Sequence, residues 1–281
     1  MLHVVGTPIG NLGDLSPRAA SVLSSVALIA CEDTRRTGRL LQLVGIAKRP
    51  MAVVNQHTEA DVIGRVLGAL EAGDDVALVS DAGMPTISDP GAVLVAAVVE
   101  AGFAPVVVPG PSASLAALAV SGLVGDRFCF EGFLPRKGAE RGRRIATLAS
   151  DPRISVLFEA PHRVLRTVSD LAEACGSDRR VAMCRELTKL HEEVWRGSLG
   201  EAVQHLGADA PRGEYVLVLS GRAEQTVEAD DDGIVAALVE LTEQGTSTRD
   251  AVAEVAKRLD VPRRRVYGLA VQHFDEGQSD S

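Results

Sequence analysis

The sequence is poor in aromatic residues and has no excess of positive charge. Aromatic residues make up only 3% of its 281 residues, whereas apolar residues make up 46%. The core must therefore be built from Val, Leu and Ala, which suits parallel sheets covered by helices on both faces. The net charge of −9 gives no general attraction to nucleic acid or to a membrane surface. A nucleic-acid partner would need a local basic patch.

Sequence signals of several other protein classes are also missing. Four cysteines lie far apart without paired spacing, so we expect no disulfide framework, no zinc site and no other metal. No apolar run approaches the length of a membrane span, and the N-terminus lacks a basic leader. The dinucleotide fingerprint, the P-loop lysine and the nucleophile elbow are absent too. We therefore expect a cytoplasmic protein without membrane contact.

One stretch is too rich in Gly, Pro and Asp for a simple turn. Residues 80–91 read SDAGMPTISDPG, between an apolar run at 76–79 and another at 92–99. The first run predicts a buried strand and the second a helix. The carboxyl end of a strand is where open α/β sheets bind ligands. Gly83 and Gly91 allow backbone angles that are closed to other residues. We interpret the stretch as a ligand loop.

The second half of this loop also has a simpler interpretation as a helix start. Ser88 or Asp89 would cap the helix, and Pro90 would occupy its first position. We therefore expect residues 81–87 to contact the ligand, and residues 88–91 mainly to begin the helix.

Two similar loops follow other predicted strands in the first part of the chain. They are residues 6–11, GTPIGN, and residues 109–114, PGPSAS, where Ser112 is expected to cap the next helix. Five predicted strands alternate with helices in this part. That alternation predicts a parallel α/β domain over residues 1–122.

Residues 123–222 predict a second, mixed α/β domain. Its strands are expected at 154–158, 181–184 and 215–219, with an edge strand or hairpin arm at 192–198. Residues 136–144 hold five basic residues against one acidic residue. This segment is either a solvated helix start or a patch for phosphate groups. The candidate RNA-binding residues are Arg136, Lys137, Arg141, Arg143 and Arg144.

The last part of the chain predicts a small helical extension. An acidic linker at 221–233 leads into three helical stretches within residues 233–275. The last two, joined by a turn at 260–262, resemble a helix-turn-helix unit. That unit would either read DNA or, as we favour, act as a simple helical cap.

Eight short motifs occur in order along the chain: TPIGN at 7–11, EDTR at 32–35, SDAG at 80–83, ISDPG at 87–91, PGPSA at 109–113, GFLPRK at 132–137, PHR at 161–163 and ELTK at 186–189. Together they resemble the motifs of the ribosomal RNA small subunit methyltransferase I family, which belongs to the tetrapyrrole methylase superfamily. The resemblance runs from Leu2 to about Gly221. The chain departs from the family pattern at Met84, where Thr is usual, and at Ala160, where Ser is usual.

The resemblance implies two α/β domains with S-adenosylmethionine in the cleft between them. It further implies a homodimer that methylates the 2′-oxygen of a cytidine ribose in the decoding region of 16S rRNA, as naked RNA or in the small ribosomal subunit. By resemblance, the cofactor would lie on Pro8, Asp81, Ala82, Gly83, Met84, Ile87, Ser112, Ala113, Ala160 and Leu187.

Methyl transfer to a ribose hydroxyl would be helped by a base, or by a cation that favours the alkoxide. Five side chains at predicted strand ends are candidates, and the sequence does not choose among them: Glu32, Arg35, Glu159, His162 and Lys189. For Glu32 and Arg35, an ordinary helix start fits equally well. Two other functions stay open, a methyltransferase for a tetrapyrrole such as a precorrin and a non-catalytic RNA-binding assembly factor.

Overall fold

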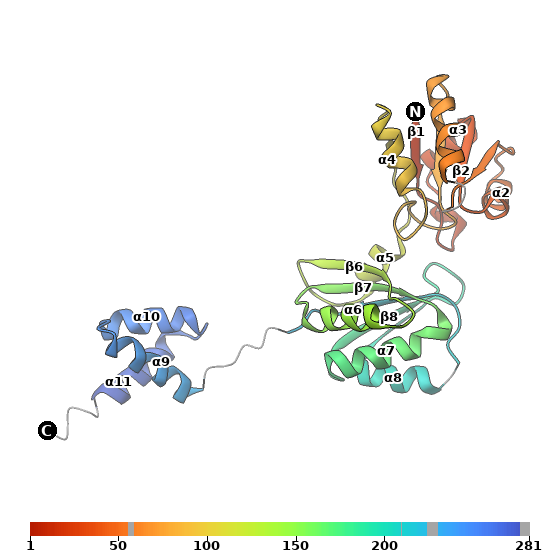
Figure 1. Cartoon of the computed structure of the whole chain (residues 1–281). Coiled ribbons are helices and arrows are strands. Elements are labelled where there is room, and N and C mark those ends of the chain that lie inside the picture. Colours follow the sequence, from red (N-terminus) through yellow and green to blue (C-terminus); the bar gives the residue numbers. More distant parts are fainter. Residues whose placement is uncertain (56–58, 209, 224–229, 276–281) are drawn as a thin grey trace. The chain divides into compact units, whose positions relative to one another are not determined.

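The computed structural model describes residues 1–55, 59–208, 210–223 and 230–275 (Figure 1). The chain divides into two compact units, residues 1–222 and 223–281, and each is described by itself. Within the first unit lie two sheets, so the predicted α/β class with two α/β parts is confirmed. The bounds predicted for these parts, 1–122 and 123–222, stay a prediction, as does the bound of the helical extension.

The first sheet is parallel throughout, in the strand order β3-β2-β4-β1-β5. Its strands are short and mostly buried on both faces, as expected of a sheet covered by helices on both sides. The predicted strands at 2–5 and 76–79 have the same ends in the structure, whereas the other three differ by one or two residues at an end. The strands are β1 (Leu2–Val5), β2 (Leu28–Cys31), β3 (Met51–Val53), β4 (Val76–Val79) and β5 (Val106–Val108).

Alternate residues of these strands point into two separate cores, because successive side chains of a strand face opposite sides of a sheet. Leu28 and Ala30 pack with helices α3 and α4, whereas Ile29 and Cys31 pack with α1 and α2. Ser16 caps α1 and Ser112 caps α5, both as predicted. The helices are α1 (Pro17–Ser25), α2 (Thr34–Leu43), α3 (Glu59–Glu71), α4 (Ala92–Glu100) and α5 (Ala113–Val120), after a short 3₁₀ helix η1 (Leu12–Asp14).

The second sheet is mixed, in the order β6-β7-β10-β8-β9. Strands β6 and β7 pair in parallel, and the remaining pairs are antiparallel, with the predicted edge strand β9 at one border. Strand β10 has the predicted ends. The strands are β6 (Phe128–Phe133), β7 (Ile154–Glu159), β8 (Arg180–Arg185), β9 (Glu193–Ser198) and β10 (Tyr215–Leu219).

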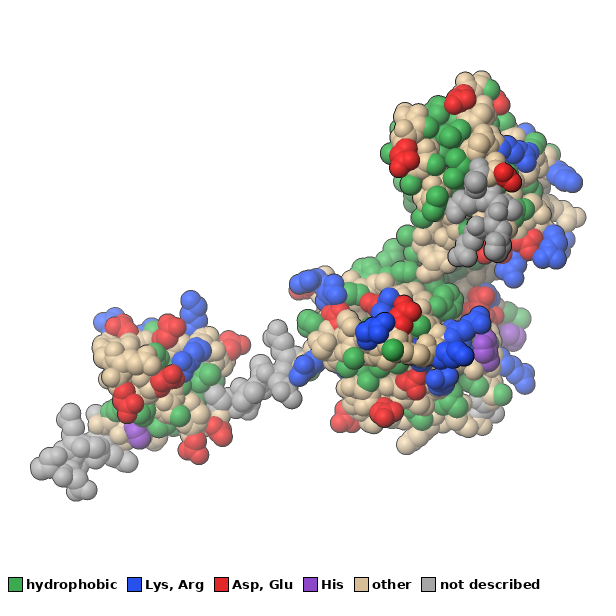
Figure 2. Space-filling view, in the orientation of Figure 1, with side chains coloured by type: hydrophobic (Ala, Val, Ile, Leu, Met, Phe, Trp, Pro, Cys, Tyr) green, Lys and Arg blue, Asp and Glu red, His purple; other side chains and the backbone are tan. Residues whose placement is uncertain are grey.

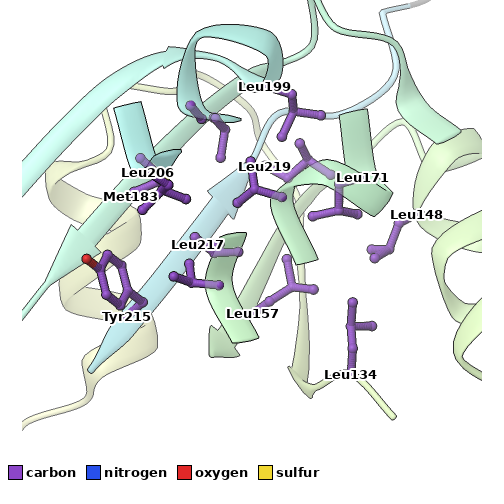
Figure 3. Packing of buried hydrophobic residues seen from close by; sticks show 14 of the residues in the cluster. Leu134, Leu148, Leu157, Leu171, Met183, Leu199, Leu206, Tyr215, Leu217 and Leu219 are labelled. Carbon is purple, nitrogen blue, oxygen red and sulfur yellow. The ribbon is translucent and has the colours of Figure 1, made fainter. Parts of the chain in front are cut away.

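Leucine fills the core between this sheet and three helices. Leu157, Leu217 and Met183 project from neighbouring strands toward leucines of the helices, and Tyr215 closes one end of the cluster (Figure 3). The opposite face of the sheet packs against α5. The three helices are α6 (Ala139–Ser150), α7 (Pro161–Cys175) and α8 (Leu199–Ala208). Sequence reasoning did not predict α8.

In the C-terminal unit, the described residues 230–275 form three helices around a small core of their own. Ile234, Leu238, Val252 and Val266 are buried in this core. Residues 224–229 of the predicted acidic linker lie outside the described residues. The helices are α9 (Asp231–Glu243), α10 (Thr248–Arg258) and α11 (Arg263–Asp275). None of the helices in the described ranges is long and apolar enough to cross a membrane.

Candidate functional site

Loops that follow β1, β4 and β5 border a cavity of about 450 Å³. Residues that follow β7 and β8, together with the start of β10, form its other side. The cavity therefore lies at the carboxyl ends of parallel strands, where α/β sheets bind ligands. Its volume falls within the range of about 300–1,000 Å³ that is usual for small-molecule sites.

The three loops of the first sheet are held together by backbone contacts. Thr7 and Gly83 exchange hydrogen bonds, with N···O distances of 2.9 and 3.1 Å. A side chain at Gly6 would place its Cβ 2.6 Å from Cα of Gly110 and 2.7 Å from Sδ of Met84. Glycine is thus required at Gly6 for a close approach of backbones. These contacts hold the three loops in fixed positions relative to one another.

The two sides of the cavity also touch each other. The backbone N–H of Asn11 donates a hydrogen bond to Oγ1 of Thr188 at 3.1 Å. The preceding residue, Gly10, lies so close to Thr188 and Lys189 that a Cβ would clash with both. These contacts fix the first-sheet loop against the loop after β8.

Backbone strain is concentrated in the two loops that face each other across the cavity. Thr86 and Ser88 have positive φ angles of 74° and 63°, and Glu186 and Thr188 have φ angles of 50° and 66°. Only one other non-glycine residue in the described ranges, Asp260, has a positive φ. Such conformations cost about 1–3 kcal/mol each and cluster at ligand sites. The strain therefore marks both loops as functional surfaces.

Most of the residues predicted to hold the cofactor line this cavity. The lining set includes Ala82, Gly83, Met84, Ile87, Ser112, Ala113, Ala160 and Leu187. Pro8 and Asp81 are not among the described lining residues. Asp81 instead accepts a hydrogen bond from the N–H of Asp33 at 3.2 Å and lies 3.4 Å from Nε of Arg36. The carboxylate of Asp81 thus joins the loop after β4 to the start of α2.

The helix after β4 begins at Ala92, where the apolar run predicted it, but its predicted cap is wrong. The N-cap of α4 is Gly91, with φ of 116° and no side-chain capping bond, so neither Ser88 nor Asp89 caps the helix. A Cβ at Gly91 would lie 2.9 Å from Cδ2 of Leu78. Glycine thus permits both the angle and the contact with the core. Ser88 and Asp89 line the cavity instead.

Asp89 is one of the lining residues that sequence reasoning missed. Burial raises the pKa of its carboxyl to about 6; the charges of Glu32 and Asp81 add to this rise, and a hydrogen bond from Ser80 opposes it. No ion pair joins Asp89 to a basic side chain in the described part of the chain. A carboxylate with a pKa near neutrality in a cavity is suited to accepting a proton. The only signal in the sequence was its position in the loop at a strand end.

The five catalytic candidates are not equivalent in the structure. Glu159, His162 and Lys189 line the cavity, whereas Glu32 and Arg35 are absent from its described lining. Arg35 is mostly exposed, and its guanidinium pairs with the carboxylate of Asp33 at 2.8 Å. This pair fits the helix-start interpretation rather than a role inside the cavity.

The oxygens of Glu159 are already occupied. One accepts from the N–H of Ala160 at 2.9 Å and lies 3.2 Å from Nε of Arg163, and the other accepts from Oγ1 of Thr167 at 2.6 Å. Three of the roughly four acceptor positions of this carboxylate are thus taken by its own surroundings. We therefore assign Glu159 to the support of the cavity wall.

Lys189 is held at the cavity edge by two carboxylates. Its Nζ lies 2.9 Å from Oε1 of Glu186 and 2.8 Å from Oε2 of Glu214. Burial alone would lower the pKa of Lys189, but the hydrogen bonds to Glu214 and Glu186 raise it above the ordinary value. The ammonium group therefore stays charged and fixed in position.

The basic segment at 136–144 is only partly available for RNA. Arg141 is buried and donates hydrogen bonds to Asp170 at 2.7 Å and to Thr167 at 3.0 Å, so its predicted role in phosphate binding is wrong. Arg144 pairs with Glu131 at 2.6 Å and donates to its backbone oxygen. Arg136, Lys137 and Arg143 are exposed and remain predicted RNA contacts.

Comparison with known proteins identifies the family to which this architecture belongs. A family model described as tetrapyrrole (corrin/porphyrin) methylases matches residues 1–203. Proteins named ribosomal RNA small subunit methyltransferase I match almost the whole chain; the one from Synechocystis sp. is 42% identical over 99% of both chains. The chain belongs to this methyltransferase I family, within the tetrapyrrole methylases.

Other members of the methyltransferase I family differ in how much of the chain they match. The protein of that name from Mycobacterium tuberculosis is 41% identical over 95% of this chain and 93% of its own. The one from Thermotoga maritima is 48% identical over 221 residues, 79% of this chain and 98% of its own. The Thermotoga match is thus about as long as the first unit, residues 1–222.

Solved structures of tetrapyrrole methylases share the fold. Cobalt precorrin-4 methyltransferase aligns with a TM-score of 0.58 at 16% identity over 78% of this chain and 94% of its own. The uroporphyrin-III C-methyl transferase from Thermus thermophilus, complexed with S-adenyl homocysteine, aligns with a TM-score of 0.55 at 18% identity over 78% of this chain and 96% of its own. Likenesses at this identity establish the fold alone.

Proposed function

We propose that the protein transfers a methyl group from S-adenosylmethionine to the 2′-oxygen of a cytidine ribose in the decoding region of 16S rRNA. The observation that carries this proposal is the near-full-length match, at 42% identity, to proteins named for methylation of small-subunit ribosomal RNA. The strained loops and the cavity between them supply a matching site within the first unit.

The residues of the cavity fit S-adenosylmethionine as the methyl donor. When bound, this cofactor supplies an electrophilic methyl group on a positively charged sulfur. Ala82, Gly83 and Ala113 offer small side chains that let a nucleoside approach the backbone, and Ile87 and Leu187 offer apolar surface. The carboxylate of Asp89 lies on the same lining and suits the positive charge.

We assign the proton transfer to Asp89. A ribose hydroxyl is a poor nucleophile until its proton is accepted by a base. Asp89 lines the cavity, and its pKa of about 6 leaves the carboxylate ionised at neutral pH yet more basic than an ordinary aspartate. The fixed ammonium group of Lys189 favours negative charge on the reacting oxygen.

Positioning of the two bound substrates supplies the other part of the rate enhancement. Transfer between two bound groups gains up to about 10 kcal/mol when the reacting atoms are held near contact distance and aligned. The hydrogen bonds between Thr7 and Gly83 and between Asn11 and Thr188 hold the cavity walls in register. The protein therefore aligns its substrates without first ordering its own loops.

A homodimer is part of the proposal. Val93, Val99, Val107 and Leu115 are each more than half exposed, and they lie on α4, β5 and α5 at the β5 edge of the first sheet. Several large apolar side chains exposed on neighbouring elements are typical of an interface between subunits. Sedimentation of the wild type and of Val107→Glu should show a dimer and a monomer, respectively.

A methyl-transfer assay with two substrates tests the reaction. Small ribosomal subunits from cells without the gene should accept labelled methyl groups, and a porphyrinogen should not. The cavity lining includes the carboxylates of Asp89, Glu159 and Glu214 but only one lysine, which disfavours a polyanionic tetrapyrrole. Transfer to the porphyrinogen alone would favour a tetrapyrrole methyltransferase. Failure to bind S-adenosylmethionine in calorimetry would favour a non-catalytic factor.

A further inference from the structure

A second cavity lies beside helix α2, away from the residues that line the first. It has a volume of about 660 Å³ and lies between one face of α2 and residues 46–51. We call it the α2 groove. Gly38 and Gln42 contribute the helix side, and Ile46, Lys48 and Arg49 contribute the other side. None of the described residues that line it is acidic.

The α2 groove lies in a basic segment of the chain, formed by α2 and the loop that follows it. Residues 34–50 contain five Lys and Arg residues and no Asp or Glu, although the whole chain carries a net charge of −9. Figure 2, in the orientation of Figure 1, shows Lys and Arg side chains gathered at the edge where α2 lies. Such a local reversal of charge is typical of a surface that binds phosphate groups.

Three of these five cations, Arg39, Lys48 and Arg49, have no acidic partner in the described ranges. Arg35 pairs with Asp33 and Arg36 with Asp81, and Arg39 donates to the side chain of Gln42. Lys48 and Arg49 form no ion pair within the described ranges. Nε of Arg49 is also buried without a hydrogen-bond partner there. A buried donor without a hydrogen-bond partner is unfavourable. An anion in the α2 groove could accept a hydrogen bond from Nε of Arg49 and so remove this cost.

The two cavities differ in the charge of their lining residues, and they follow neighbouring strands of the first sheet. The first is lined by carboxylates and the α2 groove by cations. Helix α2 begins just after β2, and β2 pairs with β4, whose loop borders the first cavity. The N–H of Asp33 bonds to the carboxylate of Asp81 at 3.2 Å across this junction. A chain molecule that reaches the first cavity from this side would pass along α2.

We propose that the α2 groove binds the sugar-phosphate backbone of the RNA substrate beside the nucleotide that enters the first cavity. Lys48 and Arg49 contact phosphate oxygens, and Ile46 and Met51 pack against the sugars. This proposal rests on the proposed function and extends it, because the basic segment at 136–144 retains only three exposed cations. The sequence did not indicate the groove, since its cations are spread over a helix and the loop after it.

Removal of the two free charges is the first test. Methyl transfer to small ribosomal subunits should show a KM at least tenfold higher for Lys48→Ala/Arg49→Ala than for the wild type. The slope of log affinity against log salt should fall by about 0.7–0.9 per lost phosphate contact. Affinity for S-adenosylmethionine should be unchanged. The control is Arg127→Ala/Arg180→Ala, which removes two exposed charges elsewhere and should leave both quantities as in the wild type.

A second variant blocks the α2 groove with an apolar side chain and leaves its charge unchanged. A Cβ at Gly38 meets nothing within 4 Å, so Gly38→Leu would place a side chain in the groove without a clash at its base. It should raise the KM for subunits while keeping the melting temperature. Gly64→Leu on α3 is the matched control, because a Cβ at Gly64 also meets nothing within 4 Å.

The outcomes separate this proposal from the proposed function. Equal KM values and salt slopes for the wild type and Lys48→Ala/Arg49→Ala would overturn the groove proposal while leaving the reaction intact. If the wild type fails to methylate subunits, the proposed function fails. Fluorescence anisotropy with a labelled oligoribonucleotide then decides the groove alone. A weaker affinity of the double variant would support it, and an unchanged affinity would overturn it.

Discussion

Thr7 and Gly83 exchange two backbone hydrogen bonds, 2.9 and 3.1 Å long, although 76 residues separate them in the chain. Oγ1 of Thr7 also lies 3.3 Å from the backbone oxygen of Ser80. These bonds join the loop after β1 to the loop after β4. The cavity wall is therefore a fixed surface, and changes in its packing should alter both stability and ligand affinity.

Gly6→Ala should damage this wall directly. The new Cβ would meet Cα of Gly110 at 2.6 Å, and this backbone atom cannot move aside. We expect a loss of about 1–3 kcal/mol in the free energy of unfolding, together with weaker binding of S-adenosylmethionine in calorimetry. Gly64→Ala, in an open position on α3, should slightly stabilise the protein. Equal stability and affinity of Gly6→Ala and wild type would show that the loops are not tightly packed.

Asp89→Asn should change how stability depends on pH. The pKa of Asp89 is raised in the folded protein from an ordinary value of 3.8 to about 6. Its contribution to stability is thus fully present below pH 3.8 and is lost as the pH rises through about 6. Asparagine has no such loss. Urea unfolding should show the variant gaining stability relative to wild type between these pH values, and a constant difference would contradict the raised pKa.

Arg141→Leu should destabilise the fold rather than weaken RNA contacts. The buried guanidinium joins Asp170, Thr167 and the backbone oxygen of Pro135. Its loss leaves these groups without their partner, at a cost of about 3 kcal/mol in the free energy of unfolding. Urea unfolding measures this cost. The salt slope of RNA binding should match that of the wild type, whereas a lower slope would restore Arg141 as a phosphate contact.

Ala160→Ser should stabilise the protein. Ala160 is the N-cap of α7 and makes no side-chain capping bond. A serine hydroxyl there would accept from an N–H of the first turn, which adds about 1 kcal/mol to the free energy of unfolding. Ser16→Ala, which removes the bond from Ala19 to the cap of α1 at 3.1 Å, should cost a similar amount. An unchanged melting temperature for Ala160→Ser would show that the cavity side of α7 cannot accommodate the hydroxyl.

The sequence was sufficient where structure depends on neighbouring residues in the chain. The apolar run at Val76–Val79 and the run at Tyr215–Leu219 predicted strands with the observed ends. Likewise, Ser112 was predicted and found as a helix cap. Each of these features follows from local hydrophobicity or from a local hydrogen bond.

The sequence was insufficient where distant residues decide the outcome. Arg141 belonged to a basic segment, but its burial depends on Asp170, 29 residues further along the chain. Asp89 fitted a helix cap by type and spacing, whereas the observed cap is Gly91, at which a Cβ would lie 2.9 Å from Leu78. No local pattern carries either fact, because each arises when separate segments pack together.

The most direct test of the central claim is to map ribose methylation on 16S rRNA from cells with and without the gene. The proposed function predicts that one 2′-O-methylated cytidine in the decoding region disappears when the gene is removed. It should return with the wild-type chain but not with Asp89→Asn, whose S-adenosylmethionine affinity is checked by calorimetry. An identical methylation map in both strains would contradict the proposed function.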